Sequence, residues 1–280
     1  MSSGAPRSIR QPVTTAWRAA ARIGKGVLPQ AVRAPVERRL GERADRRRVI
    51  DLSYARILRE APLDSLEDPI RLAELLCAGG LNDELLVQFP PELEQYTGFG
   101  LRLWQYPNQF SRYLIEIARR CVRRYLEIGI RHGGSFVATV EYLSRFTSLR
   151  EAVAVDIDPV ASLLPYPLDH PAVRIVQADT QTPQFAEWVR RRRPFDLVFI
   201  DGLHTFDACL RDFESVRGHA RLIALHDIVN PLVPDVERVW QEVKVRYAQQ
   251  FDFLEFVDQY RAVEDATGHR HMGIGLAIRR

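Results

Sequence analysis

Residues 124–136 read Arg-Tyr-Leu-Glu-Ile-Gly-Ile-Arg-His-Gly-Gly-Ser-Phe, a short apolar run that leads into a loop with three glycines. A short, nearly continuous apolar run is typical of a strand that is buried on both faces of a parallel sheet. The glycines allow a sharp turn and a close approach of the backbone to a ligand. The loop differs from the dinucleotide fingerprint GxGxxG, because Arg131 stands in place of the second glycine. We therefore expect a strand, a ligand-binding loop and a helix.

The same pattern repeats along the chain after this unit. Short apolar runs alternate with helix-length segments, which predicts βα units and helices on both faces of a sheet. Two more apolar runs near the C-terminus predict an antiparallel pair at the sheet edge. The expected fold class is α/β, a doubly wound, mostly parallel seven-stranded sheet with a helical N-terminal extension. The predicted strands are 125–128, 152–155, 173–176, 197–200, 222–225, 253–257 and 272–278.

Charge and composition divide the chain into three predicted parts. Residues 1–50 form a basic arm with twelve Lys and Arg against three acidic residues, and it is also compatible with a solvated tail. Residues 51–120 are expected to form a helical cap or lid, and 121–280 the main domain. No apolar run approaches the roughly 20 residues of a transmembrane helix. Three cysteines without a CxxC pair are typical of a reduced, cytoplasmic protein.

Polar residues follow each predicted strand of the main domain, at the edge where open α/β sheets bind ligands. The carboxylate of Asp156 can accept hydrogen bonds from both hydroxyls of a ribose, and that of Asp179 from an adenine amine. Further along, two Asp and two His residues should meet at the ends of neighbouring strands. Two carboxylates with imidazole nearby can bind a divalent cation, and a neutral imidazole can take a proton from a hydroxyl. This group comprises Asp201, His204, His226 and Asp227.

Residues 123–227 resemble the class I S-adenosylmethionine-dependent methyltransferases. The resemblance rests on Glu127-Ile-Gly129, Val155-Asp156, Ala178-Asp179 and the run from Phe195 to Asp201. It implies the Rossmann-like methyltransferase fold and S-adenosylmethionine as cofactor. In the roles that it implies, Glu127 and Gly129 line the methionine moiety, Asp156 holds the ribose and Asp179 lies beside the adenine. Gly133 and Ser135 complete the predicted cofactor loop.

The stretch 201–212 and the pair His226–Asp227 are similar to a narrower group. These are the metal-assisted O-methyltransferases of macrolide sugars, which share the signature with cephalosporin hydroxylase-like proteins. The resemblance implies Asp201 and Asp227 as ligands of Mg²⁺ and His204 as general base beside Asp201. This chain departs from the pattern at His226, where many relatives carry Glu, and imidazole is a poor ligand for magnesium. His226 is interpreted either as a third metal ligand or as a contact to the substrate.

An aromatic stretch precedes the main domain and is a candidate lid over the acceptor. Within it, Trp104 and Tyr106 are the candidate substrate contacts, with Gln105, Asn108 and Gln109 as polar neighbours. The same rings are equally compatible with packing of the leading helix against the sheet.

The sequence thus predicts an S-adenosylmethionine-dependent methyltransferase that methylates a hydroxyl of a small molecule, a sugar or natural product, with a divalent metal such as Mg²⁺ as a candidate second cofactor. Two alternatives stay open: a non-catalytic or hydroxylase-like member of the same fold, and a binding module that uses the basic arm. The expected partner is a small-molecule acceptor and not a nucleic acid, and a homo-oligomer is left open.

Overall fold

The computed structural model describes residues 49–159 and 161–280. The predicted basic arm lies outside the described residues except for Val49 and Ile50. The chain from Arg48 to Arg280 forms one compact unit. The division of this unit into a cap and a main domain stays a prediction. Among the described residues, no helix has the length and apolar character needed to span a bilayer.

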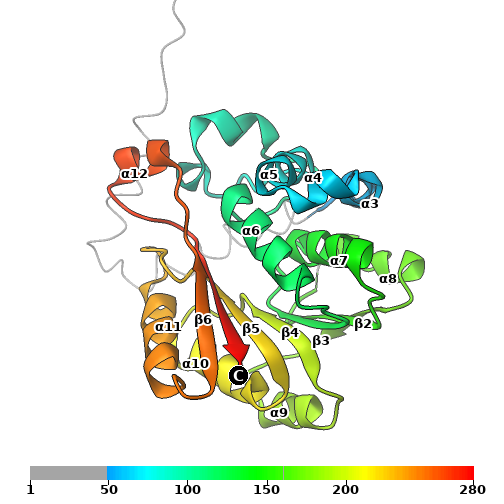
Figure 1. Ribbon diagram of the computed structural model, residues 1–280, viewed down its shortest axis with the longest axis vertical. Helices are drawn as coiled ribbons and strands as arrows, with labels where there is room; N and C mark the ends of the chain where they lie inside the picture. Colours follow the sequence, from blue (N-terminus) through cyan, green and yellow to red (C-terminus); the bar gives the residue numbers. More distant parts are fainter. Residues whose placement is uncertain (1–48, 160) are drawn as a thin grey trace, which may run out of the picture. The chain divides into compact units, whose positions relative to one another are not determined.

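The core of this unit is a seven-stranded sheet in the order β3-β2-β1-β4-β5-β7-β6 (Figure 1). Strands β1 to β5 pair in parallel, whereas β7 runs antiparallel to both β5 and β6. The predicted doubly wound, mostly parallel sheet is confirmed, and so is the antiparallel pair at its edge. The strands are β1 (Arg124–Ile128), β2 (Glu151–Asp156), β3 (Val173–Gln177), β4 (Phe195–Ile200), β5 (Ala220–His226), β6 (Phe251–Phe256) and β7 (Ile274–Arg279).

The register of the central strands brings their carboxyl ends to one level. Ile128 at the end of β1 pairs with Ile200 at the end of β4, and Ile200 pairs with Leu225 of β5. Because the order of the strands reverses beside β1, the loops that follow β1 and β4 leave the sheet next to each other at its switch point. Residues that directly follow these strands are therefore neighbours in space.

Helices cover both faces of the sheet, as the alternation of apolar runs and helix-length segments predicts (Figure 1). One face packs against α6 and α7 through residues such as Tyr113 and Phe136, and the other against α9, α10 and α11 through residues such as Phe213 and Trp240. The bounds of these and the remaining helices of the domain are α6 (Pro107–Ala118), α7 (Gly134–Phe146), η4 (Ala161–Leu163), α8 (Tyr166–Asp169), α9 (Pro183–Arg190), α10 (Phe206–Arg217), α11 (Pro234–Arg246) and α12 (Arg261–Thr267).

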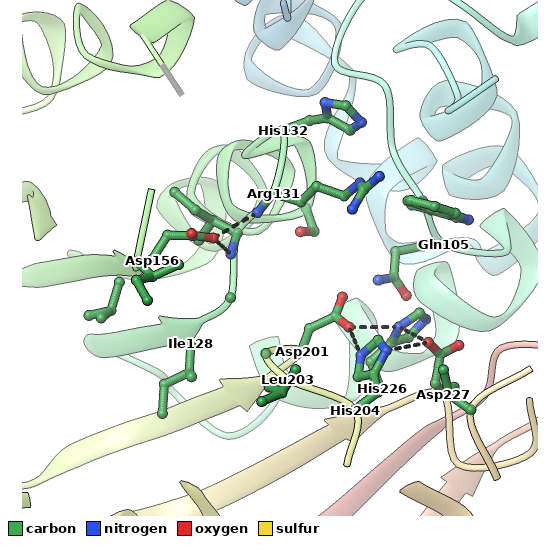
Figure 2. A pocket seen from close by; sticks show the side chains of 18 of the residues that line it. Gln105, Ile128, Arg131, His132, Asp156, Asp201, Leu203, His204, His226 and Asp227 are labelled. Atoms are coloured by element: carbon green, nitrogen blue, oxygen red, sulfur yellow. Dashed lines mark hydrogen bonds and ion pairs between the residues drawn. The ribbon is translucent and has the colours of Figure 1, made fainter. Parts of the chain in front are cut away.

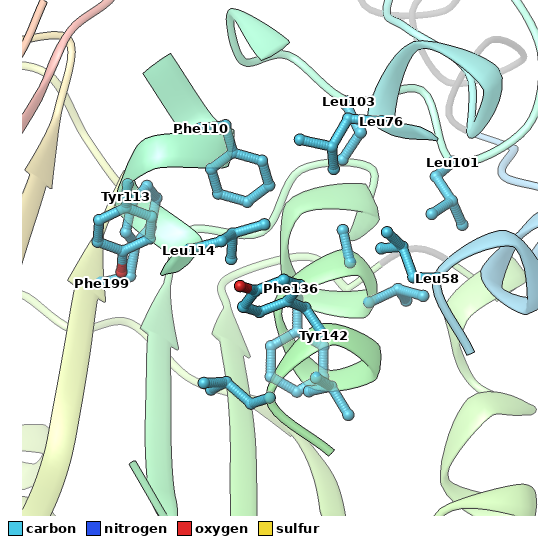
Figure 3. Close-up of a cluster of buried hydrophobic side chains, with 14 of the residues drawn as sticks. Leu58, Leu76, Leu101, Leu103, Phe110, Tyr113, Leu114, Phe136, Tyr142 and Phe199 are labelled. Carbon is cyan, nitrogen blue, oxygen red and sulfur yellow. The ribbon is translucent and has the colours of Figure 1, made fainter. Parts of the chain in front are cut away.

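The segment before α6 is mostly helical and shares its core with the first face of the sheet. Figure 3 shows Leu58 and Leu76 from this segment in the same buried cluster as Phe136 and Tyr142 of α7. Burial of these apolar side chains, at about 25 cal/mol for each Å² removed from water, holds the segment on the domain. Its elements are η1 (Leu52–Ala55), α3 (Arg56–Glu60), α4 (Leu63–Glu67), α5 (Pro69–Ala78), η2 (Leu86–Gln88) and η3 (Pro91–Tyr96).

Candidate functional site

The loop after β1 requires glycine at its first position. Gly129 has a φ of +78°, and a Cβ there would overlap the carbonyl oxygen of Asp201 after β4. At the start of α7, a Cβ on Gly134 would likewise overlap the carbonyl oxygen of Leu101. The glycines therefore let the loop pass tightly between the β4 loop and the segment that precedes α6.

Asp156 at the end of β2 holds this loop in place. Its Oδ2 accepts hydrogen bonds from the backbone N–H groups of Ile130 at 2.9 Å and Arg131 at 3.1 Å, and its Oδ1 accepts from Asp158 N at 2.9 Å. Each carboxylate oxygen has two acceptor sites, and three of the four are used, so that Oδ1 keeps capacity for one hydroxyl of a ligand. Arg131 itself has a φ of +42°, an uncommon conformation for a residue with a side chain.

Glu127, the predicted methionine contact, lies fully buried in β1. Its Oε1 accepts from the hydroxyl of Ser135 at 2.6 Å, and its Oε2 accepts from the hydroxyl of Tyr125. Burial raises the pKa of Glu127 to about 8, although both hydroxyls act in the opposite direction. The carboxyl group is therefore largely protonated at neutral pH, and its visible role is to tie β1 to the first turn of α7.

A cavity of about 620 Å³ opens at the carboxyl ends of β1, β2, β4 and β5. It is large enough for a cofactor and a small second ligand. Nine predicted site residues line it, and three do not: Glu127, Gly133 and Tyr106. The side chain of Tyr106 is fully buried, and its hydroxyl donates to the carbonyl oxygen of Gln88, which favours the packing role over direct contact with a substrate. The nine are Gly129, Ser135, Asp156, Asp179, Asp201, His204, His226, Asp227 and Trp104.

Within this cavity the structure brings the two predicted Asp and two predicted His residues together (Figure 2). Asp201 Oδ1 lies 3.0 Å from His204 Nε2 and 3.2 Å from His226 Nδ1. Asp227 Oδ2 lies 3.5 Å from His226 Nδ1 and 3.8 Å from His204 Nδ1. Two carboxylates thus flank two imidazoles. The side chain of His204 is 29% exposed and that of His226 only 4%, so His204 is the one more open to a ligand.

The carboxylates in this cluster favour the protonated form of the imidazoles, and the imidazoles favour the ionised form of Asp201. Burial alone would lower the pKa of His226, but the carboxylates of Asp201 and Asp227 outweigh it and raise the pKa to about 9. Burial acts on His204 in the same direction, and the hydrogen bond to Asp201 together with both carboxylate charges raises the pKa of His204 above its usual value. For Asp201, burial is likewise outweighed by the two imidazoles, which hold its pKa below the usual range. Both imidazoles are therefore stronger bases than an isolated histidine.

The donor set fits a divalent cation. Asp201, His204 and Asp227 can each offer one ligand atom, and these atoms lie within 4.8 Å of one another. His226 Nδ1 faces the same two carboxylates, whereas its buried Nε2 has no hydrogen-bond partner. Two carboxylates with imidazole favour ions such as Mn²⁺, Fe²⁺ or Zn²⁺ over Mg²⁺, which prefers oxygen ligands alone.

Side chains from the segment before α6 complete the cavity wall. Gln105 was expected as a polar neighbour of the lid, and Figure 2 shows its side chain pointing toward His226 and Asp227. Gln88 and Asn230 also line the cavity, but the sequence analysis missed them. They stand 142 positions apart in the chain, and each sits in a short turn that has no repeating pattern. Their contact therefore has no local signal in the sequence.

Asn108 and Gln109, also expected as polar neighbours of the lid, have a different role. Asn108 Nδ2 and Gln109 Nε2 both donate to the carbonyl oxygen of Asp258, at 3.2 and 2.8 Å. Gln109 Oε1 accepts from the N–H of Gly273 at 2.9 Å, before β7. These two side chains therefore join α6 to the loops that flank β6 and β7.

Residues 126–228 match the family model described as "Methyltransferase domain". No curated protein matches the chain. Among solved structures, an O-methyltransferase from Bacillus cereus in complex with SAH is similar at 15% identity over 62% of this chain and 81% of that one, with a TM-score of 0.47. The O-methyltransferase TomG from Streptomyces achromogenes, involved in tomaymycin synthesis and crystallised with SAM, is similar at 18% identity over 63% of this chain and 81% of that one, with a TM-score of 0.46.

The family match covers the part of the chain that contains β1 to β5 and the loops after them. It includes the glycine loop, Asp156 and the cluster of Asp201, His204, His226 and Asp227. Residues 126–228 are thereby identified as a methyltransferase domain.

Proposed function

We propose that this protein transfers the methyl group of S-adenosylmethionine to a hydroxyl oxygen of a small molecule. The observation that supports an oxygen atom as methyl acceptor is the cluster of two imidazoles and two carboxylates. This cluster lies in the same cavity as the glycine loop and Asp156. An alcohol or phenol must lose a proton on methylation, and a base in the cavity meets that need.

The cofactor is proposed to occupy the side of the cavity formed by Gly129, Ser135, Asp156 and Asp179. Asp156 would accept a hydrogen bond from a ribose hydroxyl while it holds the loop, and Asp179 would lie by the adenine. Glu127 and Gly133 support this side from behind the cavity wall rather than from its surface. The cavity then leaves the side near Trp104 for the acceptor.

His204 is proposed as the general base. It is the more exposed of the two imidazoles, and Asp201 fixes its Nε2 at 3.0 Å. In its neutral form it would take the acceptor's proton as the oxygen–methyl bond forms and the sulfur–methyl bond breaks. Alignment of the acceptor oxygen with the methyl group would supply a large share of the rate, since well-oriented groups can gain about 7–11 kcal/mol.

A divalent cation is proposed to bind at Asp201 and Asp227, with His226 as third ligand. A bound cation would lower the pKa of an acceptor hydroxyl and orient its oxygen. His204 is also close enough to both carboxylates to serve as the third ligand, so that the two histidines compete for this role and must be separated by experiment.

The test uses the full chain, stripped of metal. Calorimetric titration with S-adenosylmethionine should show binding. Methyl transfer from labelled cofactor should appear with a panel of hydroxylated sugars and phenols, and it should rise when Mn²⁺ is added. No cofactor binding by the folded protein would overturn the proposal, whereas cofactor binding with transfer only to amines would overturn its oxygen acceptor.

The variants His204→Gln and His226→Gln separate the two imidazoles. If His204 is the base, His204→Gln keeps Mn²⁺ binding and loses transfer, and His226→Gln loses Mn²⁺ affinity. The reverse pattern would exchange the two assignments.

A further inference from the structure

The chain leaves β5 through a strained turn that starts at Asp227. This residue has a φ of +62°, which costs about 1–3 kcal/mol for a side chain other than glycine. The backbone N–H of Asn230 donates to the carbonyl oxygen of Asp227 at 3.2 Å and closes the turn. Strain that persists beside a polar cluster needs contacts that hold it.

The side chain of Asn230 makes the second of these contacts. Its Nδ2 donates to Asp227 Oδ1 at 2.8 Å, with both residues buried. Asp227 Oδ2 then turns to the imidazoles and lies 3.5 Å from His226 Nδ1. Asn230 therefore decides which carboxylate oxygen faces the cluster.

Hydrogen bonding fixes the orientation of the Asn230 amide. Its Oδ1 accepts from the backbone N–H of Leu232 at 3.2 Å, so that Nδ2 is the atom directed at Asp227. Gln88 Nε2 also approaches Asn230 Oδ1, at 3.5 Å. Trp104 Nε1, which can only donate, donates to Gln88 Oε1 at 3.1 Å and thereby sets the Gln88 amide.

We propose that Asn230, anchored through Gln88 to Trp104, is a positioning residue that presents Asp227 Oδ2 to a metal ion. The inference rests on the metal site of the proposed function. Residues that hydrogen-bond a ligating carboxylate fix its orientation, and their loss commonly lowers metal affinity about 10–100-fold. This series of hydrogen bonds, from Trp104 through Gln88 and Asn230 to Asp227, connects the wall of the acceptor cavity to the metal site.

The experiment measures Mn²⁺ binding to the full chain by electron paramagnetic resonance, alongside calorimetric binding of S-adenosylmethionine. Asn230→Leu keeps the approximate volume and removes the donor, and we expect about 10–100-fold weaker Mn²⁺ binding with unchanged cofactor affinity. Trp104→Phe keeps an aromatic ring and removes the N–H, and we expect a several-fold loss in the same direction. The matched control is Asn108→Leu, which removes an amide bound to Asp258 O and should leave Mn²⁺ affinity unchanged.

The outcomes separate this inference from the proposed function. Wild-type Mn²⁺ affinity in both Asn230→Leu and Trp104→Phe would overturn the positioning role and leave the metal site standing. No Mn²⁺ binding by the wild type would overturn the metal site and the inference with it, while cofactor binding would still be measured. Trp104→Phe does not alter the turn after β5, so it tests the proposal even if Asn230→Leu fails to fold.

Discussion

Asp156 at the end of β2 accepts, through its Oδ2, a hydrogen bond from the backbone N–H of Ile130 at 2.9 Å, and so ties the second strand to the glycine loop of the first. The loop is strained at Arg131, and the carboxylate stabilises that conformation before any ligand arrives. A preformed loop spares a ligand the free energy of ordering it.

Asp156→Ala should therefore abolish measurable binding of S-adenosylmethionine. The variant loses the two loop contacts and the proposed ribose contact, and each hydrogen bond to a charged group contributes about 1.5–3 kcal/mol. Asp156→Asn keeps an acceptor and should bind detectably but more weakly. Calorimetry measures both, with circular dichroism to confirm the fold. Equal affinity in Asp156→Ala and the wild type would remove Asp156 from the cofactor site.

The positions of the strands and of most site residues could be predicted because their signals are local. Each buried strand is a short apolar run, and the residues that follow it must lie at one edge of a parallel sheet. Asp156, Asp201 and Asp227 were found in this way, and the structure places all three on one cavity.

The exact surroundings of single side chains could not be predicted in the same way. The sequence predicts that Glu127 contacts the cofactor, yet both of its carboxyl oxygens accept hydrogen bonds inside the domain, from the hydroxyls of Tyr125 and Ser135. Tyr125 and Glu127 are two positions apart in β1 and therefore lie on the same face of the strand, a signal that the sequence did contain. Gln88 and Asn230 meet only through the tertiary fold, so no local pattern could have predicted their contact.

His204→Gln should lower kcat for methyl transfer about 10²–10⁴-fold, the usual contribution of a general base. The affinity for S-adenosylmethionine should not change, because the proposed cofactor contacts lie at the end of β2, at the start of α7 and in the loops after β1 and β3. Initial rates with the best acceptor of the panel measure the effect. His269→Gln, at an exposed position beyond α12, is the control. A full rate in His204→Gln would show that another group takes the proton.

Glu127→Gln should flatten the dependence of stability on pH. The pKa of Glu127 rises from 4.5 in an unfolded chain to about 8 in the fold. The folded state therefore holds a proton that the unfolded state loses, and stability falls as pH rises between these values, by up to about 1.4 kcal/mol for each pH unit. Gln cannot lose that proton. Urea unfolding at pH 5, 6, 7 and 8 should show a growing advantage of Glu127→Gln, and parallel curves would contradict the prediction.

Glu141 should show the opposite dependence on pH. This buried carboxylate of α7 accepts two hydrogen bonds from Arg59, at 2.7 and 3.0 Å, and one from Tyr166 at 2.9 Å. Burial would raise the pKa of Glu141, but His170 and Arg59 lower it to about 2. The charge therefore stabilises the fold fully above pH 4.5, and this stabilisation is lost as pH falls toward 2.

Glu141→Gln should thus lower the free energy of unfolding at pH 7 by about 1.5–3 kcal/mol, the usual contribution of hydrogen bonds to a charged group. The difference from the wild type should shrink below pH 4.5. Thermal unfolding between pH 3 and 7 measures it. Glu187→Gln, an exposed carboxylate paired with Arg190 and Arg191, is the control and should leave Tm nearly unchanged. A difference that stays constant down to pH 3 would show that the charge of Glu141 does not account for its effect.

Gly129→Ala should destabilise the domain and weaken cofactor binding together. The new Cβ would overlap the carbonyl oxygen of Asp201, and the alanine would have to keep a φ of +78°. The overlap would push β1 and β4 apart where the cofactor loop meets the Asp201 cluster. A strained left-handed residue alone costs about 1–3 kcal/mol. Gly218→Ala is the matched control, because nothing lies within 4 Å of its Cβ and its φ of −78° suits alanine. That control should gain about 0.4–1 kcal/mol from a less flexible unfolded chain. The urea concentration at the unfolding midpoint should therefore fall for Gly129→Ala and rise for Gly218→Ala. A higher midpoint for Gly129→Ala would show that the loop can accommodate a Cβ at this position.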